Sequence, residues 1–555
     1  MAARQFQRFS TLRQVCHSHA GSGWLPVLLM VGACLGGLPQ RGSAQDSLPV
    51  LSPGSPVEGV ITKQPLAYGL NLVAGQFLRV KGEGDDVLLR LIGPRGDTLQ
   101  LTWRPRLMLS QVVQETGLYR LEIYGYKEED SVAQRYKLRV DELLSPARYA
   151  ARQDSLRNDP RVAWLARHAI PMRSLAPDDD DFTDLEPLRE AIGNARVVLL
   201  GEESHGDGTA VRAKSRLVRF LHQEMGFDVV AFESSLYGMW KVWQLMQAGH
   251  DPDVWSYDAD FQPLARYLGQ QAVGLHPLEV SGVDFQFSGT LSDQQLVSEL
   301  RELVAREHLG EEGKNLVPRF WTTLSGFVSD TIPWPIQQDV LSDLRWLAER
   351  LADAGTSRSA AEGRTLRLWA QVSRSLAEYM AFDWIESYND RRDRQMDRNL
   401  AWLGREYFPG RKIIVWAANT HVFRHPDRLP QATIVSRVGM DQAVREIFGD
   451  SSFVIAATAY SGQYQRIGGG PPSMTFTVVS DQDSTFELEE LLAATGQEQA
   501  VVPLRNLPPG GDWLRSPILS QISAYQSVLV TWPNHADAIL FMRVATPRAR
   551  IPDSP

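Results

Sequence analysis

The sequence predicts two folded domains, an N-terminal all-β sandwich and a larger α/β domain with a mostly parallel sheet and a helical cap. The chain has 555 residues, more than one domain ordinarily holds. Short β-type runs separated by turn residues fill the part before residue 142, whereas apolar strands alternate with helical patterns after residue 163. The apolar content of 43 % is typical of a globular protein with a sizeable core.

Residues 1–44 predict a secretory signal peptide. Three arginines head this segment without an acidic residue, residues 24–37 are largely apolar, and residues 42–44 are small. This order of a positive head, an apolar centre and a small-residue cleavage site is that of an export signal. We therefore expect the mature protein to be exported, to the periplasm or the extracellular space.

Both cysteines, Cys16 and Cys34, lie inside the predicted signal. Residues 31–34 loosely resemble a bacterial lipoprotein cleavage box, so an alternative is a lipid anchor at Cys34. Cleavage after Ala44 instead leaves no cysteine, and neither a disulfide nor a cysteine-built zinc site is then available.

Two classes of partner are disfavoured by composition. No segment after the signal reaches the ~18 uninterrupted apolar residues that a membrane-spanning helix needs. The formal net charge is −9 and becomes more negative when the signal with its arginines is removed. An acidic protein of this kind is a poor candidate for nucleic-acid binding.

Residues 45–142 predict the β-sandwich. Runs such as Val87 to Ile92 and Tyr119 to Tyr124 are dense in Val, Leu and Tyr and are separated by Gly-Asp and Thr-Gly turns. The stretches AYGLNLVAGQFLRVKGEG, DDVLLRLIGPRGD and ETGLYRLEIYG resemble the bacterial pre-peptidase C-terminal type of β-sandwich, often appended to secreted hydrolases. A spacer or generic surface-binding module is the simpler interpretation. Residues 143–162, polar and with helical spacing, are the predicted linker.

Residues 163–548 predict the α/β domain, with 549–555 as a tail. Short apolar runs, as expected of strands covered on both faces, alternate with helical stretches. The predicted strands are Arg196 to Gly201, Phe227 to Phe232, Leu278 to Val283, Lys412 to Ala417 and Ser452 to Thr458. A long helical block from Leu291 to Trp402 is the predicted cap.

Ionisable side chains follow four of these strands. Glu202 and His205 follow the first strand in the stretch GEESHG, and Glu233, Asp284 and His421 follow three others. Carboxyl ends of parallel strands meet at one edge of a sheet, where ligands bind and helix N-termini point. Any one of these residues alone is more simply a helix cap or loop residue, but four strands delivering such groups to one edge predict a shared site.

This set of residues suits hydrolysis by an activated water molecule. The imidazole of His205 can accept a proton from water near neutral pH, with Glu202 or Glu233 on its other ring nitrogen fixing the tautomer. His421 would polarise the carbonyl or protonate the leaving group, and Lys214 or Arg392 would stabilise the oxyanion. The side chains predicted to bind substrate are Lys214, Asp284, Arg392 and Asn419.

Two other chemistries fit less well. Ser204 lacks the nucleophile elbow, because Glu202 stands where that turn needs a glycine and only Gly206 matches. A metal held by His205 and His421 with carboxylates is chemically feasible, but no zinc-type spacing such as HExxH occurs. We therefore predict neither a metal nor another cofactor.

The block VVLLGEESHGDGTAVRAKSRLVRFLHQEMGFDVVAFESS resembles the defining motif of the erythromycin esterase family. Three further segments agree in order: GVDFQ at 282–286, NDRRDRQMDRNLAWL at 389–403 and VWAANTHV at 415–422. The resemblance runs from about residue 190 to 545. It implies an α/β catalytic domain with a helical cap and metal-independent, water-mediated ester cleavage.

Family roles carry over residue by residue onto this chain. The resemblance places catalytic roles on Glu202, His205, Glu233 and His421. It matches Lys214 to a position that is usually basic. The cap-helix motif corresponds to Arg392, Asp393, Met396 and Asn399. Two positions depart from the family pattern: Ala418 replaces the first of two active-site histidines, and Thr209 stands where an acidic residue is common.

We therefore predict an exported hydrolase that acts on a small-molecule ester or lactone, a macrolide lactone being one candidate. The loss of a second imidazole at Ala418 leaves two alternatives open: a catalytically silent binding protein with the same cleft, and an acyl transferase of surface polysaccharide metabolism. The shape of the cap, which no motif reports, decides the substrate, and the oligomeric state is not predicted.

Overall fold

The computed structural model describes residues 48–61, 64–84, 87–103, 107–125, 134–251, 258–286, 290–307, 309, 334–381, 387–430, 436–465, 475–478 and 485–551. The predicted signal peptide at 1–44, with Cys16 and Cys34, lies outside these ranges, as do residues 310–333 of the predicted cap. In the described part of the chain, no helix has the length and apolar character needed to cross a membrane.

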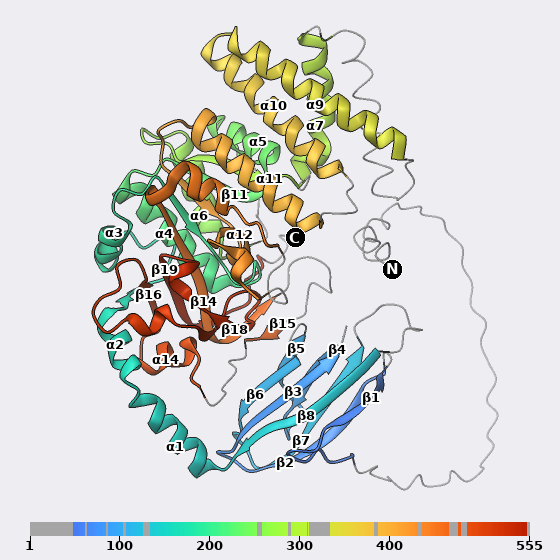
Figure 1. Ribbon diagram of the computed structural model, residues 1–555, viewed down its shortest axis with the longest axis vertical. Helices are drawn as coiled ribbons and strands as arrows, with labels where there is room; N and C mark the ends of the chain where they lie inside the picture. Colours follow the sequence, from blue (N-terminus) through green and yellow to red (C-terminus); the bar gives the residue numbers. More distant parts are fainter. Residues whose placement is uncertain are drawn as a thin grey trace, which may run out of the picture.

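The N-terminal region consists of two four-stranded antiparallel sheets, lowest in Figure 1. One sheet has the order β1 (Val57–Ile61), β8 (Gln134–Leu144), β3 (Phe77–Gly84), β6 (Leu107–Val112), and the other β2 (Leu66–Leu72), β7 (Gly117–Gly125), β4 (Val87–Ile92), β5 (Thr98–Trp103). One hydrophobic cluster takes side chains from both sheets. Buried and less buried residues alternate along β8, as a strand with one face on the core requires.

Two helices connect this region to the larger domain. They are α1 (Pro146–Arg157) and α2 (Pro160–His168). Ser145 and Asp159 cap them with side-chain oxygens, and each helix starts with a proline, whose missing N–H costs nothing in the first turn. The predicted linker is therefore largely helical.

The centre of the larger domain is a nine-stranded sheet with the order β12-β11-β13-β10-β14-β19-β16-β9, with β15 paired to β14. The strands are β9 (Ile170–Pro171), β10 (Val197–Leu200), β11 (Val229–Ser235), β12 (Glu279–Asp284), β13 (Ile413–Trp416), β14 (Ser452–Gln465), β15 (Thr475–Thr477), β16 (Gln499–Pro503) and β19 (Ala538–Ala545). In this order, neighbouring strands from β12 to β19 pair in parallel. β16 pairs antiparallel with both β19 and β9, so β16 runs opposite to the others in this order. Each of the five predicted strands has its counterpart here.

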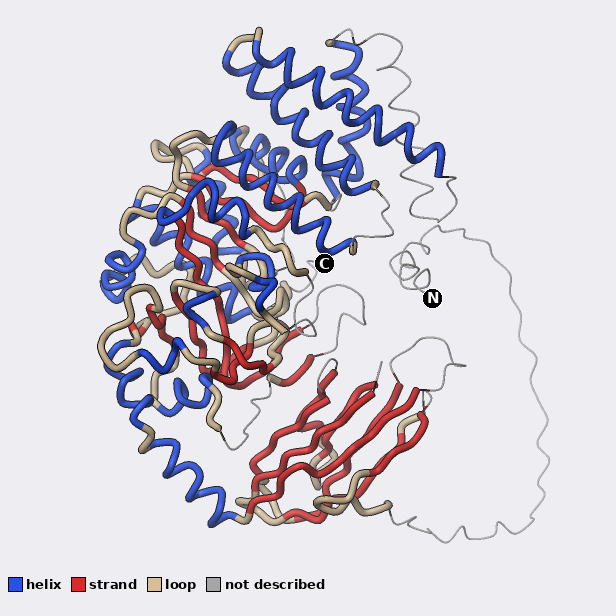
Figure 2. Tube along the Cα trace, viewed as in Figure 1, coloured by secondary structure: helices blue, strands red, loops and turns tan. Residues whose placement is uncertain are grey.

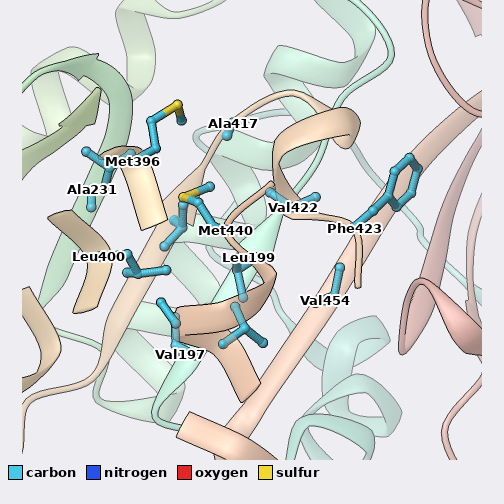
Figure 3. Packing of buried hydrophobic residues seen from close by; sticks show 14 of the residues in the cluster. Val197, Leu199, Ala231, Met396, Leu400, Ala417, Val422, Phe423, Met440 and Val454 are labelled. Atoms are coloured by element: carbon cyan, nitrogen blue, oxygen red, sulfur yellow. The ribbon is translucent and has the colours of Figure 1, made fainter. Parts of the chain in front are cut away.

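Helices cover both faces of this sheet, red in Figure 2. Along β10, Val197 and Leu199 belong to one hydrophobic cluster and Val198 and Leu200 to another, because successive side chains point to opposite faces. One face packs on α3 (Glu186–Ile192), α4 (Gly208–Met225) and α6 (Gln262–Ala272). In the other cluster, Met396 and Leu400 pack with Val197 and Leu199 (Figure 3).

The predicted cap contains α7 (Thr290–Arg306), α9 (Trp334–Thr356), α10 (Ala360–Met380) and α11 (Tyr388–Trp402). α9 and α10 are uppermost in Figure 1, and α11 lies below them. Other described elements of the domain include α5 (Leu236–Gln247), α12 (Asn419–Val422), α13 (Asp441–Ala443), α14 (Leu488–Ala494), β17 (Ile518–Gln521) and β18 (Ser527–Val530). Ser359 and Ser387 cap α10 and α11. α11 continues into a π-helical turn, η2 (Leu403–Tyr407).

Candidate active site

Strand register brings the predicted residues to one edge of the sheet. Leu200 and Phe232 both align with Trp416 of β13, so β10 and β13 end at the level of Phe232, and β11 continues beyond it to Ser235. Glu202 and His421 follow the ends of β10 and β13, and Glu233 lies in the last part of β11, which is longer than predicted, so the three side chains enter the same space. The structure thus brings together side chains that are more than 200 residues apart in the chain.

Glycines in the loop GEESHG allow close backbone approach. A Cβ on Gly201 would lie 2.2 Å from the Asn419 side-chain oxygen, and one on Gly206 would lie 1.6 Å from the Gln465 carbonyl oxygen. Neither space admits a side chain. After the loop, Asp207 caps α4 by accepting the backbone N–H groups of the next turn. The loop is therefore fixed at both ends.

His205 is held by the carboxylate of Glu202. Its Nδ1 lies 2.6 Å from Glu202 Oε1, and Lys214 Nζ donates to Glu202 Oε2 at 2.8 Å. Burial alone would raise the pKa of Glu202, but Lys214 and His205 lower it to about 2. Glu202 is therefore a permanent anion, which orients the imidazole ring of His205 and favours its charged form.

His421 is held in a similar way by a carboxylate on α11. Its Nδ1 lies 2.6 Å from Asp393 Oδ1, and its Nε2 lies 3.2 Å from Glu233 Oε1. The two imidazoles differ in access: the side chain of His421 is 7 % exposed and that of His205 is 43 % exposed. Solvent and ligands can therefore reach His205 more readily.

Glu233 is the centre of the site. Its Oε1 lies 3.5 Å from His205 Nε2 and 2.7 Å from Arg392 Nη2, in addition to its contact with His421. Its Oε2 accepts the backbone N–H of Ala418 at 2.8 Å. Burial would raise the pKa of Glu233, but the charges of His421, His205 and Arg392 hold it well below its usual value.

Both imidazoles are more basic than free histidine. Burial alone would lower the pKa of His205, but Glu233 and Glu202 raise it to about 10. Burial would likewise lower the pKa of His421, but Asp393 and Glu233 raise it to about 10. The resting site therefore favours two imidazolium ions around one carboxylate.

Two of the residues predicted to bind substrate, Lys214 and Asn419, lie behind the site. Lys214 is fully buried, donates also to the Ala417 carbonyl at 3.1 Å and lies over the Trp416 ring. Asn419 is fully buried and bonds to backbone groups of Ala457 and Ile522. Their burial places these side chains out of reach of a ligand, in supporting positions.

Arg392 pairs with Asp284 and with Glu233. Arg392 donates to both carboxylate oxygens of Asp284 at 2.7–3.1 Å. Asp284 is 2 % exposed, so it positions the guanidinium and does not meet a ligand itself. Of the four predicted substrate-binding residues, Arg392 alone borders the imidazoles directly, with Nη1 3.4 Å from His421 Nε2.

Two other carboxylates in or next to the loop, Glu203 and Asp207, form hydrogen bonds with Tyr525. Glu203 is buried and accepts the backbone N–H of Tyr525 at 3.0 Å, while the Tyr525 hydroxyl donates to Asp207. Burial raises the pKa of Glu203 well above its usual value and that of Asp207 to about 6. Sequence reasoning missed this cluster because Tyr525 is more than 300 residues away.

The alternatives weighed from sequence find little support in this geometry. Ser204 Oγ donates to the Gln465 carbonyl at 3.2 Å, and both ring nitrogens of the neighbouring His205 face carboxylates. A metal ion between His205 and His421 would meet the guanidinium of Arg392, a cation already seated on Glu233. The donor set therefore does not fit a metal centre.

The fold and site define an α/β protein whose histidine–carboxylate centre lies at the carboxyl edge of a parallel sheet, next to helix α11 of the cap. The erythromycin esterase family model matches residues 222–543, and the chain belongs to the erythromycin esterase family. Because this match begins after the loop at 201–206, the placement of Glu202 and His205 in the site depends on the geometry given above.

Individual relatives agree with this membership. The chain is 22 % identical over 443 residues to the Bacillus subtilis (strain 168) protein named "Putative hydrolase YbfO", covering 69 % of this chain and 91 % of that one. It is 40 % identical over 70 residues to erythromycin esterase type II of Escherichia coli, 13 % of this chain and 16 % of that one. The structure of a mutant erythromycin esterase EreC in its open conformation has the same fold, with a TM-score of 0.52 and 18 % identity over 67 % of this chain and 97 % of that one.

Proposed function

We propose that this chain is an exported hydrolase that cleaves a carboxylic ester or lactone with a water molecule activated at His205. The observation that carries the proposal is the convergence of two imidazoles, one exposed and one buried, on a single oxygen of Glu233. Membership of the family and the hydrolase and esterase names of its relatives support the reaction class.

His205 suits the role of general base. Glu202 holds Nδ1, so Nε2 is the nitrogen that exchanges a proton. Nε2 lies 3.5 Å from Glu233 Oε1, longer than an ordinary hydrogen bond, and the ring is 43 % exposed. A water molecule or substrate oxygen can therefore approach Nε2. The raised pKa makes neutral His205 a strong base, present as a minor fraction at neutral pH.

His421 suits the complementary role of acid. Asp393 holds its Nδ1, and the pKa of about 10 keeps the ring protonated at neutral pH. Its Nε2 and the guanidinium of Arg392 put two positive groups beside Glu233. Charge that develops on a carbonyl or leaving oxygen would be stabilised there without reorganisation of the site.

The experiment is turnover of a panel of activated esters and lactones by the purified mature chain. We expect His205→Gln to lower kcat/KM by about 10²-fold or more, because the base is removed. His250→Gln, at an exposed histidine outside the site, is the matched control and should leave turnover unchanged. Wild-type turnover in His205→Gln would refute the proposal.

Two other results would indicate a different function for this chain. Saturable binding of an ester without turnover by the wild-type chain would indicate a binding protein. Mass analysis showing transfer to an added alcohol in place of acid release would indicate an acyl transferase.

Export is tested separately, by fractionating cells and sequencing the N-terminus of the mature protein. The mature protein should begin at Gln45 if the signal is cleaved as predicted, or at Cys34 if the chain is a lipoprotein.

A further inference from the structure

A groove lies on the helical cap between α10, α11 and the turn η2, with one side chain contributed by α9. Its volume is about 400 Å³. α10 and α11 are neighbouring helices in Figure 1. Its walls carry four arginines, Arg345, Arg374, Arg398 and Arg405, and we call it the arginine groove.

The arginine groove has more cations than anions. Two carboxylates, Glu378 and Glu406, line it together with the four arginines. Glu378 is shared between Arg345 at 3.9 Å and Arg398 at 3.7 Å, both longer than hydrogen bonds. Within the described ranges, no carboxylate pairs with Arg374 or Arg405. The guanidinium of Arg374 donates instead to the neutral amide oxygen of Gln371 at 3.1 Å.

A buried donor in the wall of the groove also lacks an acceptor. Trp402 is 5 % exposed, and its indole N–H has no hydrogen-bond partner among the described residues. A buried N–H without an acceptor is uncommon and costs stability. The ring stacks on Tyr407 at 4.7 Å, so its plane is fixed. The guanidinium groups of Arg374 and Arg405, which have no carboxylate partner among the described residues, are the donors that call for an acceptor from outside the chain.

The floor of the arginine groove is a rigid polar layer. Gln371 and Gln395 are buried and donate their amide N–H groups to Asn399 Oδ1 at 2.7 and 3.0 Å. Asn399 in turn donates to the Val283 carbonyl at 2.8 Å. These bonds anchor the floor to the strand β12, so the arginines stand on a fixed base.

We propose that the arginine groove binds a small anionic ligand through a phosphate or carboxylate group. Guanidinium groups match the paired oxygens of both anions and bind them by charge-assisted hydrogen bonds. Ala377, Ala401 and the Trp402 ring supply an apolar wall for the rest of the ligand. The groove is distinct from the histidine–carboxylate centre, so this proposal does not depend on the hydrolase proposal.

The experiment is isothermal titration of the mature chain with inorganic phosphate and, separately, with succinate, at constant ionic strength. We expect saturable binding of at least one anion at millimolar concentration. Arg374→Gln with Arg405→Gln should weaken it by about tenfold or more, because two charge-assisted donors are lost. The control pair, Arg301→Gln with Arg350→Gln, removes the same charge from exposed positions outside the groove and should leave the dissociation constant unchanged.

Each outcome decides the proposal. Binding of phosphate alone, or of succinate alone, supports it and identifies the class of ligand. Absence of saturable binding to both anions, or an equal loss in the control pair, overturns it. Should the double variant fail to fold by circular dichroism, Arg405→Gln alone replaces it: loss of one charge-assisted donor should weaken binding, and an unchanged dissociation constant would count against the groove.

Discussion

His205 and His421 face the same oxygen of Glu233, at 3.5 and 3.2 Å, although they are more than 200 residues apart in the chain. Each ring is held at its other nitrogen by a second carboxylate, Glu202 or Asp393, at 2.6 Å. The two imidazoles therefore titrate as a pair around one shared anion, and the pH dependence of the proposed reaction belongs to the pair.

The first prediction concerns the pH profile of hydrolysis. If neutral His205 is the base, kcat/KM rises with pH through the raised pKa of His205, well above the ordinary value near ~6.5. Glu202→Gln removes a negative charge that favours imidazolium, so the acidic limb should move to lower pH. The measurement is kcat/KM from pH 5 to 10. If the acidic limb lies at the same pH in both proteins, it does not report the titration of His205.

The second prediction concerns Asp393, which is 1 % exposed on α11 and contacts His421 Nδ1. Among the groups that raise the pKa of His421, Asp393 has the largest effect, and Asp393→Asn removes its charge. His421 should then lose its proton at lower pH, and the alkaline limb of the profile should shift to lower pH. We expect kcat/KM at neutral pH to fall about 10²-fold. Asp397→Asn, one turn along the helix and bonded to the Ala443 N–H, is the control and should keep the limb in place.

The third prediction concerns stability. Glu233→Gln leaves His205, His421 and Arg392 without their shared anion, and breaking a buried ion pair costs about 3 kcal/mol. The part of this loss of unfolding free energy that comes from the two histidines should be largest below pH ~6.5, where both imidazoles are charged in the unfolded chain as well. It should shrink as the pH rises through about 10, the pKa of both rings in the folded protein. The part of the loss that comes from Arg392 should persist over this pH range, because the guanidinium group stays charged.

Urea unfolding of wild type and Glu233→Gln at several pH values measures this difference. Glu224→Gln, at an exposed pair with Arg189, serves as the control and should cost less than about 1 kcal/mol at every pH. A difference between wild type and Glu233→Gln that grows from neutral to alkaline pH would contradict the assignment of charged imidazoles.

Sequence reasoning located the strands and the residues at their ends, because apolar runs followed by ionisable groups mark the carboxyl edge of a parallel sheet. It could not distinguish ligand-facing from supporting residues. Lys214 and Asn419 carry the same functional groups whether they face solvent or are buried, and their burial depends on α4 and α12 packing against the sheet. The partnership of His421 with Asp393 depends on how α11 crosses the sheet, which no local pattern encodes.

No pattern in the sequence predicts the contacts of residues 546–549, which span the boundary between the predicted α/β domain (163–548) and the predicted tail (549–555). Gly208 N–H donates to the Thr546 carbonyl at 2.7 Å, and Asp207 pairs with Pro547 in an isolated bridge. Ala549 N–H donates to Asp260 at 2.8 Å. The segment 546–549 therefore lies along Asp207 and Gly208, directly after the loop 201–206, and fastens that loop from outside.

The fourth prediction is that Arg548 positions His205 through this segment. Arg548 Nη1 donates to the His205 carbonyl at 3.0 Å, and its guanidinium also pairs with the buried Asp258. Arg548→Gln frees the backbone of His205, so kcat should fall about tenfold with KM little changed, because a base loosened by an ångström transfers protons less well. Arg550→Gln, exposed two residues on, removes the same charge without touching the loop and should retain wild-type kcat. Equal effects of the two substitutions, or a loss confined to KM, would show that Arg548 acts through general charge and not through the carbonyl of His205.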